Sequence, residues 1–334
     1  MILSGLLLLA GVVILYLGAE WLIRGAARMG THLGIAPIIL GLTVISIGTS
    51  APELVVSVLA ALRGTPDLAL GNVLGSNLAN VGLILGLAAL IRPLKVAESV
   101  VRRDLPWMVA VTLITFLLIL NLQVGRLEGT AFALVLFVYL TVLFLRWKSE
   151  GGDTIGAVSG VASLDDSPAS GDDPAGRSDR PSTPYRPWIE AGRAVLGVLG
   201  LVAGGQLIVA GATDLAVTLG ISELVLGLSV VAVGTSLPEL ATTVVAAVRG
   251  ETDMAVGNIV GSNIFNLTFV LGGTALVHPL VVAERILTVE YPVVLLMSLL
   301  LVPLAMQGRE VGRAKGVVLL LAYVGAWVWI QSAG

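Results

Sequence analysis

Two short motifs decide how this chain folds: Gly48-Thr49-Ser50-Ala51-Pro52-Glu53 and its near copy Gly234-Thr235-Ser236-Leu237-Pro238-Glu239. Each motif places one carboxylate and one proline inside a long apolar run. An ionisable side chain at the middle of a bilayer costs about 2.5 to 3.5 kcal/mol on insertion scales, so its charge needs to be offset. Proline also removes a backbone hydrogen bond and opens the helix around it. The carbonyl oxygens of Gly48 and Gly234 are therefore expected to lose their helical partners.

The composition is that of an integral membrane protein. The chain has 334 residues, of which 56% are hydrophobic and only 12% are charged, whereas soluble domains are about 25% charged. Apolar runs of about 20 residues are long enough to cross a hydrocarbon core about 30 Å thick. Ten such runs are predicted, at residues 2–23, 36–62, 67–90, 105–122, 128–147, 188–212, 221–248, 253–276, 287–306 and 313–331. We therefore expect an all-α polytopic membrane protein.

The distribution of basic residues predicts which side of the membrane each loop faces. Lysine and arginine favour the cytoplasmic side. With the N-terminus outside, 16 of the 19 basic residues fall on cytoplasmic segments, and only Arg63, Arg126 and Arg285 lie outside. The first residues carry no basic region of the kind that opens a signal peptide, so residues 2–23 are expected to be a retained span. We expect a multi-pass protein of the cell membrane with both termini extracellular.

A polar segment separates two copies of one design. Residues 148–187 are rich in Ser, Gly, Pro and Asp, and we expect a disordered cytoplasmic linker because such a segment buries too little apolar surface to fold. Residues 34–94 align with residues 220–280 at a constant offset of 186, with 31 identities in 61 positions. The two halves are then residues 1–147 and 188–334, each with five predicted spans. An odd number of spans makes the second half enter from the opposite side, which gives the inverted repeat that is common among secondary transporters.

The repeated motifs supply hard oxygen ligands. On a helix, Thr49 and Ser50 lie four and three residues before Glu53, so both hydroxyls share the side of the carboxylate. The second motif repeats this arrangement with Thr235, Ser236 and Glu239. Two carboxylates with hydroxyl and carbonyl oxygens form a cage whose charge balances one Ca2+ or two monovalent cations. Cysteine is absent, and the only two histidines, His32 and His278, lie near span ends, so a soft-metal site and a disulfide are excluded.

The next predicted span of each half adds polar residues at intervals of four. They are Asn72, Ser76 and Asn80 in the first half, and Asn258, Ser262 and Asn266 in the second. The glycines beside them allow neighbouring helices to approach closely. We expect Ser76 and Ser262 to bind ions, and Asn80 and Asn266 to line the central cavity. Two interpretations stay open for Asn72, Asn258, Asn77 and Asn263, which either bind ions or form hydrogen bonds between helices.

These residues make the chain similar to the cation/Ca2+ exchanger superfamily, and within it to the prokaryotic Na+/Ca2+ exchangers. The resemblance rests on Gly-Thr-Ser-x-Pro-Glu followed by Gly-Asn-x-x-Gly-Ser-Asn, each present twice at one offset, and it covers essentially the whole chain. It implies that spans 2, 3, 7 and 8 enclose the ion sites and that spans 1 and 6 slide past them to switch access. Carried over residue by residue, it implies that Ca2+ is held by Glu53, Glu239, Thr49 and Thr235. For Na+ it implies Ser50, Ser76, Ser236, Ser262, Glu53, Glu239 and the backbone carbonyls of Ser46 and Ala232, with Asn80 and Asn266 lining the centre.

The function that this resemblance implies is a secondary antiporter that exchanges Na+ for Ca2+ by alternating access. Potassium-dependent members carry Asp where this chain has Asn266, which implies independence of K+. Proton-coupled relatives show Gly-Asn rather than Gly-Thr-Ser before the glutamate. A Ca2+/H+ antiporter and, in a different class, a cation channel stay open as alternatives.

An enzyme is the weakest interpretation of this sequence. It shows no pair of nucleophile and base, no phosphate-binding loop and no His-rich metal site. No cofactor, nucleic acid or obligate protein partner is expected. The expected partners are the lipid bilayer and the transported ions, Na+ and Ca2+.

Overall fold

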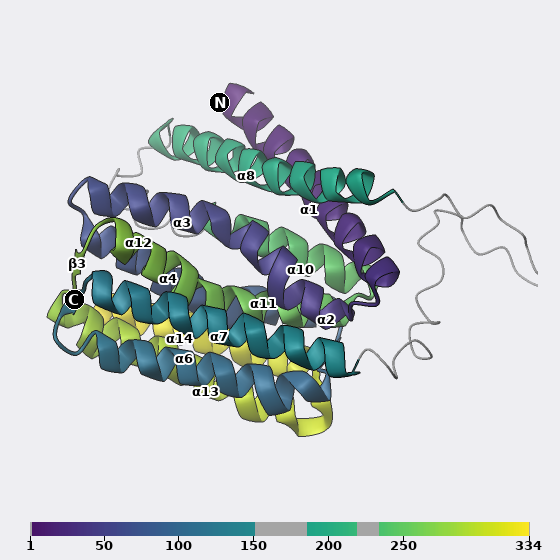
Figure 1. The fold of residues 1–334 in the computed structure, drawn as a ribbon. Coiled ribbons are helices and arrows are strands. Elements are labelled where there is room, and N and C mark those ends of the chain that lie inside the picture. Colours follow the sequence, from purple (N-terminus) through teal and green to yellow (C-terminus); the bar gives the residue numbers. More distant parts are fainter. Residues whose placement is uncertain (1, 151–185, 219–233, 334) are drawn as a thin grey trace, which may run out of the picture.

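The computed structural model describes residues 2–150, 186–218 and 234–333, which are almost entirely helical (Figure 1). The helices of the first half are α1 (Ile2–Leu33), α2 (Pro37–Leu40), α3 (Ser46–Leu62), α4 (Pro66–Ala79), α5 (Leu85–Ile91), α6 (Leu105–Leu118) and α7 (Arg126–Glu150). Those of the second half are α8 (Pro187–Thr218), α10 (Leu237–Arg249), α11 (Thr252–Phe265), α12 (Leu271–Val277), α13 (Tyr291–Met306) and α14 (Arg313–Ser332). Short π-helical turns join several of them: η1 (Gly41–Ile45), η2 (Asn80–Ile84), η3 (Val100–Asp104), η6 (Asn266–Val270) and η7 (Ile286–Glu290). A 3-10 turn, η8 (Gln307–Arg309), follows α13.

Eight helical stretches of the described residues are long and apolar enough to span a membrane. They are Leu3–Leu33, Pro37–Leu62, Pro66–Ile91, Arg126–Leu145, Pro187–Leu215, Thr252–Val277, Ile286–Arg309 and Arg313–Ser332. The other two predicted spans coincide with shorter helices. The helix α6 has only 14 residues and follows a turn that carries three charged side chains, and α10 has 13 residues. The part of the predicted span 221–248 that precedes residue 234 lies outside the described residues.

The predicted boundaries hold for most of these helices, with three clear differences. The helix α1 continues ten residues beyond the predicted end at residue 23, and α8 continues to Thr218 rather than residue 212. Arg24, the first residue beyond the predicted end, forms an ion pair with Glu20 of the same helix at 2.6 Å. The helix α7 also runs through residues 148–150, which were predicted to begin the linker. Residues 151–185 of that predicted linker lie outside the described residues.

The second half repeats the first element by element. The helix α11 begins 186 residues after α4, and η6, α12 and η7 follow η2, α5 and η3 at the same offset. Four two-residue strands connect the halves: β1 (Leu94–Lys95), β2 (Gln123–Val124), β3 (Leu280–Val281) and β4 (Glu310–Val311). The strand β1 pairs antiparallel with β4, and β2 with β3, in the registers Leu94 to Val311 and Val124 to Leu280. Each two-stranded sheet therefore contains one strand from each half.

The long helices α1 and α8 pack against one another as an antiparallel pair. Glycines at intervals of seven residues line the contact: Gly11, Gly18 and Gly25 on α1, and Gly197, Gly204 and Gly211 on α8. A Cβ atom added at Gly18 would lie 2.6 Å from the backbone nitrogen of Leu201 and 2.8 Å from the carbonyl oxygen of Gly197. The two backbones thus approach as closely as glycine permits. Between Gly18 and Gly25 of α1, Glu20 forms an ion pair with Arg249 of α10.

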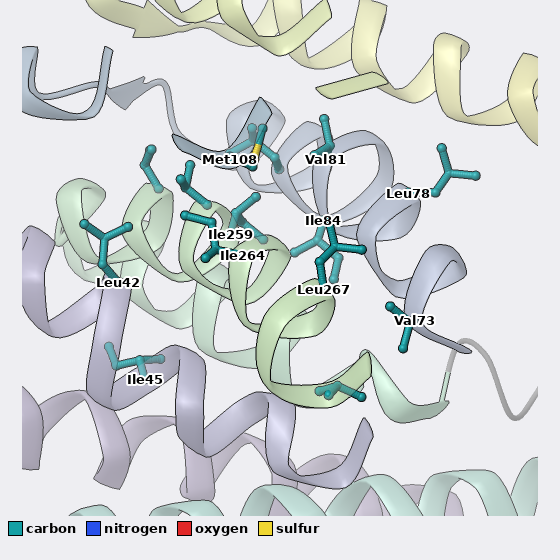
Figure 2. Packing of buried hydrophobic residues seen from close by; sticks show 14 of the residues in the cluster. Leu42, Ile45, Val73, Leu78, Val81, Ile84, Met108, Ile259, Ile264 and Leu267 are labelled. Atoms are coloured by element: carbon teal, nitrogen blue, oxygen red, sulfur yellow. The ribbon is translucent and has the colours of Figure 1, made fainter. Parts of the chain in front are cut away.

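The helices are arranged in layers, with α1 and α8 on one side of the molecule (Figure 1). The middle layer contains α3, α4, α10 and α11, and α6, α7, α13 and α14 lie on the far side from α1 and α8 (Figure 1). Leucine, isoleucine and valine side chains from both halves fill the middle layer, as Figure 2 shows for Leu42, Val81, Ile259 and Leu267. This apolar packing surrounds the two Gly-Thr-Ser-x-Pro-Glu motifs.

Candidate ion-binding site

The two repeated motifs occupy different positions on their helices. Pro52 lies inside α3, which continues from Ser46 to Leu62 without the opening that was expected at this proline. Pro238 instead lies in the first turn of α10, which begins after a turn at Ser236. A proline is tolerated in that position because its missing N–H group would have had no helical partner there. The helical backbone is interrupted at Ser236, between residues 234–235 and α10, which agrees with the expectation that a proline opens the helix in the second motif.

The carboxyl groups of Glu53 and Glu239 are completely buried. They lie close enough to interact electrostatically. Among the residues that the structure describes, no group donates a hydrogen bond to either carboxyl oxygen of Glu53 or to the Oε2 atom of Glu239, while Ser50 Oγ donates to Glu239 Oε1 at 3.5 Å. Buried polar groups in proteins are nearly always paired, so these oxygens mark a candidate binding site for a ligand. A cation satisfies carboxylate oxygens in this way.

Hydroxyl groups of the two motifs contact the polar helix of the opposite repeat. Thr49 Oγ1 lies 3.5 Å from Ser262 Oγ, and Ser236 Oγ lies 3.1 Å from Ser76 Oγ. These contacts join α3 to α11 and the start of α10 to α4. All four side chains are buried. The predicted ligands Thr49, Ser76, Ser236 and Ser262 therefore gather between the repeats, beside the two carboxylates.

Of the four asparagines with two open interpretations, Asn72, Asn77 and Asn258 form hydrogen bonds between helices through their side chains, whereas Asn263 Nδ2 donates to Ile259 O of its own helix. Thr235 Oγ1 donates to Asn72 Oδ1 at 2.9 Å, and Thr49 Oγ1 lies 3.4 Å from Asn258 Oδ1. Asn77 Nδ2 donates to the carbonyl oxygen of Asn263 at 3.3 Å. Each of these bonds crosses from one repeat to the other.

Asn80 and Asn266, predicted to line the centre, are both completely buried. Within the described ranges, neither amide atom of Asn80 has a hydrogen-bond partner, and Asn266 Nδ2 donates to Asn77 Oδ1 at 3.1 Å while no donor reaches Asn266 Oδ1. The two residues open the π-helical turns η2 and η6. Such turns are frequent at functional sites because they interrupt the regular backbone ladder.

The backbone carbonyls assigned to Na+ can be placed in one half only. The carbonyl oxygen of Ser46 accepts a hydrogen bond from Thr49 Oγ1 at 3.4 Å, and the Ser46 hydroxyl donates to the carbonyl oxygens of Gly41 and Asn258. Ala232 lies outside the described residues.

Sequence reasoning missed three hydroxyl residues near the site. Asn72 Nδ2 donates to Ser57 Oγ, and Asn258 Nδ2 donates to Thr242 Oγ1 and Thr243 Oγ1, each at 3.0 Å. Ser57 and Thr243 occupy equivalent positions of the two repeats, four residues after the glutamate of each motif. That spacing was the available signal, since residues four apart share one face of a helix.

The chemistry of this cluster is that of a hard-cation site. In the described part of the chain, no three Asp, Glu, His or Cys side chains come together as a metal-binding group. The negative charge is limited to two carboxylates, and the surrounding groups are hydroxyls, amides and carbonyls. Oxygen donors of this kind suit alkali and alkaline-earth cations.

Comparison with known proteins agrees with this chemistry. The family model for the sodium/calcium exchanger protein matches residues 3–145 and 190–331. The chain belongs to the sodium/calcium exchanger family. This confirms the family expected from the two motifs, and it makes the chain a membrane transporter of the cation/Ca2+ exchanger type.

Three similar proteins illustrate how far the likeness extends. The putative antiporter CaxA of Alkalimonas amylolytica is 37% identical over 336 residues, which cover 97% of this chain and 98% of that protein. The sodium/calcium exchanger MaX1 of Methanosarcina acetivorans is 35% identical over 352 residues, with 96% of each chain covered. Among solved structures, the sodium-calcium exchanger NCX_Mj matches this exchanger with a TM-score of 0.79 at 28% identity, over 98% of each chain. The likeness therefore extends over nearly the whole chain.

Proposed function

We propose that this exchanger is a Na+/Ca2+ antiporter that works by alternating access and does not require K+. One observation carries the proposal: Glu53 and Glu239 belong to one fully buried cluster, and three of their four carboxyl oxygens have no donor among the residues that the structure describes. One Ca2+ ion or two Na+ ions would neutralise the pair, so the two substrates would compete for the same oxygens. The presence of Asn266 rather than Asp limits the formal charge of the cluster to that of the glutamates, which supports independence of K+.

The ligand assignment follows the gathered oxygens. Glu53, Glu239, Thr49 and Thr235 would hold Ca2+. Na+ would occupy sites made by the same glutamates with Ser50, Ser76, Ser236, Ser262 and the backbone carbonyls of Ser46 and Ala232, while Asn80 and Asn266 would line the centre. No cofactor or protein partner is required for this chemistry, because the transported ions and the membrane supply the remaining components.

The architecture that would perform the exchange is two inverted repeats of five spans, residues 1–147 and 188–334, joined by a cytoplasmic linker over residues 148–187. The constant offset between equivalent helices and the antiparallel packing of α1 against α8 support it. Antiparallel packing of equivalent helices requires a pseudo-twofold axis perpendicular to them, and such an axis lies in the membrane plane. With the basic residues on the cytoplasmic side of the cell membrane, both termini would be extracellular.

The exchange reaction can be tested in proteoliposomes that contain the purified protein. We expect uptake of radioactive Ca2+ into Na+-loaded vesicles, and no uptake when Na+ is equal on both sides. With Na+ inside only, replacing external choline with K+ should leave the rate unchanged. Glu53→Gln and Glu239→Gln should each reduce the rate by a factor on the order of 100 or more, because Ca2+ affinity depends strongly on ligand charge.

The principal rival is a Ca2+/H+ antiporter, because two buried carboxyl groups could also be neutralised by protons. Vesicles with a pH gradient and no Na+ separate the two functions. Ca2+ uptake driven by protons alone would contradict the proposal, as would Ca2+ flux that needs no counter-ion, which is the behaviour of a channel.

A further inference from the structure

Asn72 of α4 connects two residues of the candidate site that belong to different repeats. Its Oδ1 atom accepts the hydroxyl proton of Thr235 at 2.9 Å. Its Nδ2 atom donates to the backbone carbonyl oxygen of Glu53 at 3.2 Å and to Ser57 Oγ at 3.0 Å. Both Asn72 and Thr235 are at least nine-tenths buried. One side chain thus joins the helix that carries the first glutamate to the motif of the second repeat.

The orientation of the Asn72 amide is fixed by chemistry. A backbone carbonyl oxygen can only accept a hydrogen bond, so the atom that faces Glu53 O must be the NH2 group. The amide oxygen is then left facing Thr235, whose hydroxyl donates to it. Rotating the amide by half a turn would break the bond to Glu53 and place two oxygens in contact.

Asn258 of α11 makes the equivalent connection in the opposite direction. Its Nδ2 atom donates to Thr242 Oγ1, and the Thr242 hydroxyl donates to the carbonyl oxygens of Pro238 and Glu239 at 2.8 and 3.1 Å. Because that hydroxyl proton is already used, Thr242 Oγ1 can only accept from Asn258. The Oδ1 atom of Asn258 therefore faces Thr49 Oγ1, at 3.4 Å. This second bridge is longer than the 2.9 Å bond of the first.

We propose that Asn72 and Asn258 are positioning residues for Ca2+ binding. Each holds the motif threonine of one repeat at a fixed distance from the glutamate backbone of the other repeat. They would not touch the ion themselves. The inference rests on the proposed function, since it concerns the geometry of the proposed Ca2+ site. A divalent ion requires both glutamates and both threonines at once, so its binding depends on the bridges more than the binding of Na+, whose proposed sites include serines that the asparagines do not contact.

The test is a double-mutant cycle on the full-length protein in detergent. Calorimetric titration with Ca2+ in Na+-free buffer gives the dissociation constant for wild type, Asn72→Ala, Thr235→Val and the double variant. We expect Asn72→Ala to weaken Ca2+ binding about tenfold, because a buried hydrogen bond and its geometry are lost. In the Thr235→Val background, the same change should alter the dissociation constant less than about twofold, because the partner hydroxyl is already missing. The Na+ concentration for half-saturation should change less than about threefold.

Several results would overturn the inference. A purely structural role of Asn72 predicts that its replacement weakens binding equally with and without the Thr235 hydroxyl, so additive effects would contradict a positioning role. An equal loss of Na+ and Ca2+ affinity would also contradict it. Thr235→Ser, which keeps the hydroxyl, should restore the coupling with Asn72. Asn121→Ala removes the same side chain at an exposed turn and serves as the matched control.

A second mutant cycle and measurements on the wild-type protein distinguish failure of the positioning role from failure of the proposed function. If Asn72→Ala does not yield folded protein, the cycle of Asn258→Ala with Thr49→Val tests the same claim in the other repeat, with a smaller expected effect because its bond is longer. Wild-type protein that neither binds Ca2+ nor exchanges it would refute the proposed function. Wild-type protein that exchanges normally while both cycles are additive would refute only the positioning role.

Discussion

At the scale of single residues, the site is defined by charge that the protein leaves unpaired. In the described part of the chain, no lysine or arginine pairs with Glu53 or Glu239, and the donors near them are neutral hydroxyl groups. Elsewhere the buried acidic residues have partners: Glu20 contacts Arg24 and Arg249, and Glu190 contacts Arg193. Glu20 and Glu190 therefore stabilise the fold through ion pairs, whereas Glu53 and Glu239 are the candidate ligands for a cation.

The substitution Glu53→Gln tests this distinction through thermal stability. In buffer without Na+ or Ca2+, we expect the Tm of the variant to equal or exceed that of wild type, because an uncompensated buried charge is removed. Ca2+ at 100 times its dissociation constant should stabilise wild type by about 2.7 kcal/mol and the variant much less. Glu284→Gln, at an exposed position, is the control and should keep the full Ca2+ response. A Glu53→Gln protein that still gains the wild-type increase in Tm would show that Ca2+ binds elsewhere.

At the scale of helices, periodicity and motifs predicted which segments cross the membrane but not where every helix ends. The span predicted at residues 67–90 agrees closely with Pro66–Ile91, because proline and apolar residues delimit it. The first helix continues beyond the span predicted at residues 2–23 and includes Arg24 and Arg28. Their partners, Glu20 on the same helix and Glu190 on α8, neutralise much of that charge. A contact 162 residues distant in sequence, such as that of Arg28 with Glu190, cannot be read from local pattern.

In the candidate site too, features that depend on local sequence spacing could be predicted, whereas contacts between the repeats could not. The repeated motifs predicted the glutamates, threonines and serines, because their spacing places them on one helix face. Asn72 and Asn258 each have one hydrogen-bond partner in the opposite repeat, Thr235 and Thr49 respectively, so the sequence left their role open between ion ligand and interhelical bond. The roles of Ser57, Thr242 and Thr243 depend on these bridges and were missed for that reason.

The α1 and α8 pair offers a prediction at the element scale. Gly18→Ala would place a methyl carbon within 3 Å of the α8 backbone, so the helices would have to separate. We expect a loss of roughly 1 to 3 kcal/mol of stability, as for overpacking in a close-packed core, together with slower exchange. Gly5→Ala, on the same helix, would have no atom within 4 Å of the new carbon and should be tolerated. Equal Tm values for the two variants in detergent would contradict close backbone packing as the basis of this pair.

At the scale of the whole molecule, the two halves share a design without being identical. The helix α1 packs extensively against α10, whereas the equivalent helices α8 and α3 contact one another much less. The ion pair between Glu20 and Arg249 has no equal in the other half, where Gln206 and Arg63 occupy the equivalent positions. The pair of long helices is therefore placed asymmetrically against a nearly symmetric core. Asymmetry of this kind is what a transporter with one open side requires.

The inverted arrangement of the halves can be tested with a pair of equivalent positions. Asn121 lies between α6 and α7, and Gln307, 186 residues later, follows α13; both are exposed. Inverted repeats place these positions on opposite sides of the membrane, with Asn121 outside, whereas parallel repeats would place them on the same side. Since the chain contains no cysteine, Asn121→Cys and Gln307→Cys can be labelled without background. A membrane-impermeant maleimide should label the first variant in intact cells and the second only after permeabilisation, and labelling of both from one side would exclude the inverted repeat.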